Sequence, residues 1–138
     1  LGTARRTAIG ADPQRLALLC AVLEKKAGLV MYGHDIFLNI AGGIRIDEPA
    51  LDLGVICALA SSLRERPLSS ATVVCGEVGL AGEIRAVGQI DIRLREAERL
   101  GFTRFIMPRS NRERCSRSGQ IETIGVANLH ELLEIIFE

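Results

Sequence analysis

One segment constrains the fold more than any other, because residues 51–63 are apolar on most sides of a helix. A helix that lacks a polar face has to lie inside the molecule, with other elements packed around it. Asp47 and Glu48, followed by Pro49, predict where this helix begins, and the polar run 64–67 predicts where it ends. We therefore expect a central helix that the rest of the chain surrounds.

Helical and extended patterns alternate on both sides of that segment. Apolar residues spaced by three and four positions predict helices over 13–27, 90–100 and 129–137. Short runs of residues that favour extended structure predict strands over 3–10, 34–41, 71–75, 102–107 and 121–126. Residues 44–46 are a candidate continuation of the second strand, and the glycines at 76, 79 and 82 predict a hairpin or bulged strands over 77–85. Residues 110–120 are expected to form a polar loop that can include one helical turn. This alternation indicates one α/β domain.

Composition narrows the class of protein. The 138 residues are 48% hydrophobic and 25% charged with a formal net charge of zero, which excludes a disordered chain and a nucleic-acid protein that is basic overall. No stretch approaches the ~18 residues of a membrane span, so we expect no membrane partner. The cysteines, at 20, 57, 75 and 115, lack the spacing of metal ligands, so we expect no metal, reduced thiols and a cytoplasmic location.

The chain begins with leucine, and we expect it to be part of a longer protein. It contains no glycine-rich loop of the kind that holds nucleotide phosphates. Any ATPase activity, with its ATP and magnesium, is therefore expected in another part of that protein. We expect this domain to need no cofactor of its own.

Three stretches together resemble a known family. They are the strand 34–41 followed by DEPALDL at 47–53, the run GEVGLAGEIRAVG at 76–88, and REAERLGF at 95–102 leading into FIMP at 105–108. In order and spacing this sequence resembles the proteolytic domain of Lon proteases, and in detail the version carried by the RadA (Sms) family of bacterial RecA-related DNA-repair proteins. The resemblance implies a single Lon proteolytic-domain-like α/β domain over 1–138, with mixed sheets packed against helices. It also implies upstream zinc-finger and RecA-like ATPase domains in the parent, with the zinc held there.

The sequence departs from Lon at both catalytic positions. The Lon nucleophile is the serine of a GPSAG motif, and the matching run here, 48–52, places Ala50 at that position. The Lon lysine follows the last glycine of the glycine-rich strands, and Asp91 takes its place. A Ser–Lys dyad needs a hydroxyl to attack and an amine to accept its proton, and a methyl group can do neither. We therefore expect a protease fold without protease chemistry and with no catalytic residue.

The resemblance then implies a homo-oligomeric ring, most simply a hexamer, that holds DNA in a repair and recombination motor that drives branch migration. A ring multiplies a few arginines per subunit, which offsets zero net charge per chain. Nine arginines and four acids lie between residues 85 and 117, so the charge is polarised along the sequence. The candidates for contacts to double-stranded or single-stranded DNA are Arg5, Arg6 and Arg104, which have no acid within four positions, and Arg109, Arg112, Arg114 and Arg117 of the polar loop.

Two other functions remain open at this point. In the first, the domain is only an oligomerisation module, its arginines pair with carboxylates of neighbouring subunits, and the ATPase domain alone holds DNA. In the second, the domain keeps a residual peptidase activity. The first predicts that removing an arginine breaks the oligomer, and the second predicts peptide cleavage by a clean preparation.

Overall fold

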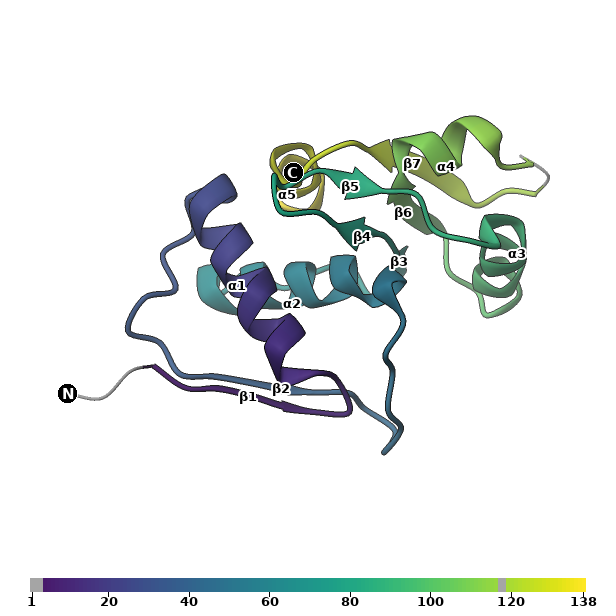
Figure 1. The fold of residues 1–138 in the computed structure, drawn as a ribbon. Helices are drawn as coiled ribbons and strands as arrows, with labels where there is room; N and C mark the ends of the chain where they lie inside the picture. Colours follow the sequence, from purple (N-terminus) through teal and green to yellow (C-terminus); the bar gives the residue numbers. More distant parts are fainter. Residues whose placement is uncertain (1–3, 117–118) are drawn as a thin grey trace.

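A computed structural model describes residues 4–116 and 119–138 of the chain (Figure 1). In chain order the elements are β1 (Arg6–Ile9), α1 (Pro13–Ala27), β2 (Ile36–Asn39), the 3-10 turn η1 (Pro49–Leu51), α2 (Asp52–Arg64), β3 (Thr72–Val74), β4 (Glu77–Val78), β5 (Ile84–Arg85), α3 (Ile90–Arg99), β6 (Arg104–Pro108), α4 (Arg109–Arg114), β7 (Glu122–Val126) and α5 (Leu129–Ile136). The α/β domain expected from the sequence is confirmed.

Helix α2 occupies the centre, as its apolar sequence predicts. Leu53, Ile56 and Ala60 have no exposed surface and belong to the main apolar cluster, which also includes residues of α1 and α5. Helical geometry begins at Pro49, in the turn η1. There the N–H of Leu51 already donates a hydrogen bond to the carbonyl of Glu48 at 3.0 Å. Glu65 ends the helix in a left-handed conformation (φ 52°) and donates its N–H to Ser61.

The N-terminal part of the chain is a β–α–β unit that covers one side of α2. Strands β1 and β2 pair in parallel, with Ala8 opposite Leu38, and α1 connects them. Asp12 caps α1 by accepting the N–H of Gln14 at 3.0 Å, and Gly28 (φ 71°) ends it, both as the sequence predicts. In Figure 1 α1 begins beside the β1–β2 sheet and rises to the upper left, so its two ends point to opposite sides of the molecule.

The remaining strands form two further sheets. Strands β3, β6 and β7 are parallel in the order β3-β6-β7, with Arg104 opposite both Thr72 and Glu122. Strands β4 and β5 form the expected antiparallel hairpin, in which Glu77 faces Arg85. A second apolar cluster lies between α3, β6 and η1, and includes Ile90, Leu94 and Phe105. The expectation of mixed sheets packed against helices is confirmed.

One local prediction was wrong, and one helix is longer than predicted. Residues 44–46 do not extend β2, because Gly42 and Gly43 both adopt left-handed angles and turn the chain back, where the N–H of Ile46 donates to Gly10. The first part of the predicted polar loop is the helix α4, Arg109–Arg114, which begins directly after Pro108 and packs on β7. None of the helices among the described residues is long and apolar enough to cross a membrane.

Candidate functional site

The position expected of the Lon nucleophile lies in a closed apolar environment. Ala50 is 6% exposed and belongs to the cluster that contains Cys75, Ile90 and Met107. Its carbonyl accepts the N–H of Gly76 at 3.0 Å, which ties the turn η1 to the chain entering the β4–β5 hairpin. On this side of the helix start, Ala50 therefore contributes apolar packing and a backbone hydrogen bond.

Two buried cysteine thiols and the carboxylate of Asp91 have well-defined surroundings in the structure. Burial raises the pKa of the Cys75 thiol to about 12, and burial does the same for Cys57, so both remain protonated near neutral pH. Asp91 lies on the exposed first turn of α3, where its Oδ1 accepts the N–H of Ser116 at 2.9 Å. The Asp91 carboxylate thus ties α3 to the chain after α4, whereas its neighbour Ile90 packs in the cluster of Ala50.

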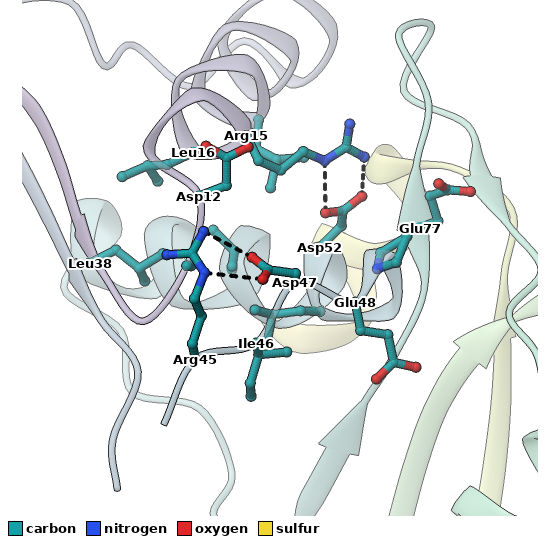
Figure 2. A pocket seen from close by; sticks show the side chains of 15 residues that line it. Asp12, Arg15, Leu16, Leu38, Arg45, Ile46, Asp47, Glu48, Asp52 and Glu77 are labelled. Atoms are coloured by element: carbon teal, nitrogen blue, oxygen red, sulfur yellow. Dashed lines mark hydrogen bonds and ion pairs between the residues drawn. The ribbon is translucent and has the colours of Figure 1, made fainter. Parts of the chain in front are cut away.

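The other side of the helix start opens into a cavity of about 450 Å³ (Figure 2). Apolar side chains from α1, β2 and α2 line it, among them Leu16, Leu38 and Val55. Charged side chains complete the lining, with five carboxylates against two guanidinium groups: Asp12, Asp47, Glu48, Asp52 and Glu77, with Arg15 and Arg45. This size lies within the range of protein pockets that take a small molecule or a side chain.

The ion pair between Arg15 and Asp52 is the most buried polar contact of the cavity. Asp52 is 3% exposed, and its Oδ1 accepts the Nε–H of Arg15 at 3.0 Å while its Oδ2 accepts the N–H of Val78 at 3.0 Å. The Nη2 of Arg15 donates to Asp52 and also to the carbonyl of Val78 at 3.1 Å. The hydrogen bond to Asp52 raises the pKa of Arg15 against the opposing effect of burial. These contacts join α1, α2 and the β4–β5 hairpin.

The rest of the cavity rim is more exposed. Arg45 pairs with Asp47 at 3.0 Å, with more than half of each side chain exposed. Glu48 pairs with Arg93 of α3, outside the cavity. Glu77 is half-buried, and no hydrogen bond or ion pair of its side chain is found among the described residues. The rim therefore keeps an excess of negative charge, which suits a cationic group rather than a phosphate.

The carboxylates of this cavity are not arranged for acid–base or metal chemistry. The side chain of Arg15 binds the carboxylate of Asp52, and that of Arg45 binds the carboxylate of Asp47. Among residues 4–116 and 119–138, no three His, Cys, Asp or Glu side chains meet in a way that could hold a metal ion. The arrangement is that of a binding surface with fixed charges and an apolar floor.

Several predicted DNA-binding arginines are used inside the fold. Arg6 donates to the carbonyls of Arg5 and His34, and to that of Met31 at 3.2 Å. Arg104 is not the unpaired arginine that its sequence neighbours predict, because strand pairing brings Glu122 to 3.9 Å from its Nε. Both guanidinium groups are therefore less available to phosphate than expected.

The arginines of the predicted loop have separate surroundings. Arg109 pairs with Glu131 at 2.8 Å, and the Nε–H of Arg112 donates to the carbonyl of Thr123 at 3.0 Å. Arg114 is exposed at the end of α4, as is Arg5 before β1, and no hydrogen bond or ion pair of either guanidinium is found within the described part of the chain. Arg117 lies outside the described residues. DNA binding by these arginines stays a prediction.

Sequence reasoning missed Arg15 and Asp52, the two residues that organise the cavity. A signal was available, because Asp52 is the only charged residue among the apolar positions 50–63 and stands where the Lon motif has its last glycine. A charge at the start of a buried helix is costly unless a partner compensates it. That argument demands a cation nearby in space, but it does not say which one.

Comparison with known proteins now tests the resemblance. The family model of the Lon protease (S16) C-terminal proteolytic domain matches residues 25–137. The chain belongs to the Lon C-terminal proteolytic domain family. The expectation drawn from the three motif stretches is thereby confirmed.

Three similar curated proteins share the name DNA repair protein RadA. The DNA repair protein RadA of Bacillus subtilis (strain 168) is 47% identical over 132 residues, which are 96% of this chain and 29% of that protein. The protein of the same name from Halalkalibacterium halodurans is 46% identical over 134 residues (97% and 29%), and that from Streptococcus pneumoniae 43% over 136 residues (99% and 32%). The chain spans less than a third of the length of these relatives.

Proposed function

We propose that this chain is a non-catalytic, DNA-binding and ring-forming domain of a RadA-type DNA repair protein. The observation that carries the proposal is the burial of Ala50, which has no nucleophilic atom, in a packed apolar cluster of a Lon-family fold. The printed name of its relatives, DNA repair protein RadA, supplies the biological setting. Without peptide hydrolysis, the fold can still act through its shape, which other subunits can contact, and through its surface charges, which DNA can contact.

The DNA-binding half of the proposal rests on the exposed arginines. Arg5 and Arg114 are exposed, and no partner of either guanidinium is found among the described residues, so a phosphate can reach them without breaking an internal contact. Phosphate contacts release counterions, and the affinity then falls steeply with salt, with a slope of about 0.9 per contact in a plot of log K against log salt. Binding by these residues would be weak per subunit and independent of DNA sequence.

Fluorescence anisotropy with a labelled DNA duplex tests this half. We expect salt-dependent binding by the wild-type chain, weaker binding by Arg5→Ala and Arg114→Ala, and a salt slope reduced by about 0.9 in each. Arg99→Ala is the matched control, because Arg99 is also exposed but pairs with Glu96 on its own helix. Wild-type protein that does not bind DNA at low salt would overturn this half of the proposal.

A second function, the pure oligomerisation module, is favoured by one observation. Each of four arginines donates a hydrogen bond to an acceptor within the chain, which leaves fewer arginines for DNA than the sequence suggests: Arg6, Arg104 (to the carbonyl of Ile135), Arg109 and Arg112. On this alternative, Arg5→Ala and Arg114→Ala change the oligomer in size-exclusion chromatography and leave DNA binding absent throughout. A ring that survives while DNA binding falls favours the first proposal.

The parent protein completes the proposal. We infer that a cytoplasmic hexamer carries out recombination and branch migration, with ATP, magnesium and zinc held by upstream domains. A residual peptidase would contradict the account of this domain. Cleavage of a fluorogenic casein substrate that persists at constant specific activity through a second purification would demonstrate one.

A further inference from the structure

The two ends of helix α1 carry surfaces of opposite character. At its beginning lies the cavity already described, which Asp12, Leu16 and Glu77 line together with the Arg15–Asp52 pair; we call it the head. At its end lies the segment 28–33, which we call the tail. A helix of 15 residues separates the two by about 22 Å. Figure 1 shows the segment after α1 at the left of the molecule, away from the turn η1 that borders the head.

The tail presents exposed side chains from a backbone that is held in place. Exposure alternates along it, with Leu29 and Met31 buried, Val30 64% exposed and Tyr32 84% exposed. Its buried side chains join the main apolar cluster. Tyrosine combines a large apolar ring with few rotatable bonds, and it is among the residues that contribute most to protein interfaces.

Hydrogen bonds fix the base of the tail. The guanidinium of Arg6 donates to the carbonyls of Met31 and His34, and the N–H of His34 donates to the carbonyl of Met31 at 3.2 Å. Arg6 thus links the start of β1 to the turn that displays Tyr32. A side chain displayed on a fixed turn loses less conformational entropy when a partner covers it.

Charge distinguishes the two ends as well. Lys25 and Lys26 are the only lysines of the chain, and both are exposed in the last turn of α1, directly before the tail. The head carries five carboxylates against two guanidinium groups. One end of the helix is therefore apolar and basic, and the other is apolar and acidic.

We propose that the head of one copy of this chain binds the tail of the next. Tyr32 enters the cavity against its apolar floor, and Lys25 and Lys26 face the carboxylates of Asp12 and Glu77. Such a contact uses two different surfaces on each copy, so it repeats from subunit to subunit and closes into a ring when the rotation allows. The inference rests on the proposed ring and names the contact that builds it.

Sedimentation velocity of the full chain over a range of concentrations tests the contact. Tyr32→Ala removes the aromatic side chain of the tail. Glu77→Lys reverses the charge of one carboxylate of the head. Each is expected to raise the concentration of half-assembly at least about tenfold. Phe37→Ala is the matched control for the first, because Phe37 is 65% exposed on the outer face of β2 and belongs neither to the segment 28–33 nor to the lining of the head. Arg99→Glu is the control for a charge reversal on an exposed helix.

Two further experiments separate this contact from a folding defect. Combining Glu77→Lys with Lys25→Glu is expected to restore part of the assembly that either change removes. Mixing equal amounts of Tyr32→Ala and Glu77→Lys is expected to give a dimer and nothing larger, because only one intact head and one intact tail remain per pair. Circular dichroism confirms that each variant is folded.

The outcomes distinguish the two proposals. Wild-type chain that stays monomeric at all concentrations overturns both the ring and the contact. Wild-type chain that assembles, with folded Tyr32→Ala and Glu77→Lys variants that assemble equally well, overturns the contact and leaves the ring. If Phe37→Ala abolishes assembly and the other variants do not, the interface lies on the outer face of β2. That result also overturns the proposed contact.

Discussion

Ala50 and Asp52 are two residues apart at the start of α2, and their surroundings are opposite. The methyl group of Ala50 packs in an apolar cluster with Cys75 and Ile90. The carboxylate of Asp52 is equally buried but lies at the wall of an open cavity, where Arg15 and the N–H of Val78 bind it. Two residues correspond to about half a helical turn, which places Ala50 on the closed apolar side and Asp52 on the charged open side.

The two sides of the helix start place different demands on the sequence. The apolar side needs only good packing, which many small residues provide equally well. The charged side needs one particular partner, because a buried carboxylate without a cation would be costly. The specific polar contacts around Asp52 therefore lie beside the position expected of the Lon nucleophile, in the cavity that we propose binds a neighbouring subunit.

The largest effect is expected from Asp52→Ala. The change leaves the Arg15 guanidinium and the Val78 N–H without their acceptor, and we expect the free energy of unfolding to fall by about 3 kcal/mol. The loss lies at the lower end for a broken buried pair, because Arg15 is 35% exposed and water can solvate it. Urea denaturation followed by circular dichroism measures it.

Asp47→Ala is the matched control on the same cavity. Its pair with Arg45 is exposed at both side chains, so the expected loss is below about 0.5 kcal/mol. Equal losses in the two variants would show that the Arg15–Asp52 pair is no more important than a surface contact, and the contrast between the two sides of the helix start would disappear.

A smaller effect is expected from Ala50→Ser on the closed side. The new hydroxyl lies in an apolar cluster, and its burial is expected to lower the free energy of unfolding by about 1 kcal/mol. We expect no cleavage of a fluorogenic peptide, because Asp91 is bound to the Ser116 N–H and no base lies in the cluster. Peptide cleavage by the purified variant, absent from the wild type, would contradict this.

Local sequence signals predicted most elements of the fold. The Asp12–Pro13 start and the Gly28 end of α1 are read from single residues whose backbone preferences are strong. The hairpin of β4 and β5 follows from closely spaced glycines, and the central place of α2 follows from its lack of a polar face. These features depend on residues a few positions apart, which a linear pattern contains.

Contacts between distant residues were not predictable in the same way. Arg104 meets Glu122 only because β6 and β7 pair in parallel, and Arg15 meets Asp52 only because α1 crosses α2. Charge counts along the sequence therefore overestimated the number of free arginines. They also missed the cavity, whose lining comes from four separate segments of the chain, at 11–19, 38, 45–55 and 77.

The smallest effect is expected from an exposed contact far from both sides of the helix start. Hydrogen bonds from the Ala127 N–H, and secondarily from Arg109, lower the pKa of Glu131 below its ordinary value of 4.5. A depressed pKa means that the charged carboxylate stabilises the fold above the unfolded pKa, and that this contribution disappears as the pH falls through the folded pKa. Glu131→Gln should therefore cost less than about 1 kcal/mol at pH 7, and the difference from wild type should shrink below pH about 4.5. Urea denaturation at several pH values, with Glu113→Gln on α4 as the control, measures it. A difference that grows toward acid pH would reverse the assigned sign and show that the carboxylate is bound more tightly in its protonated form.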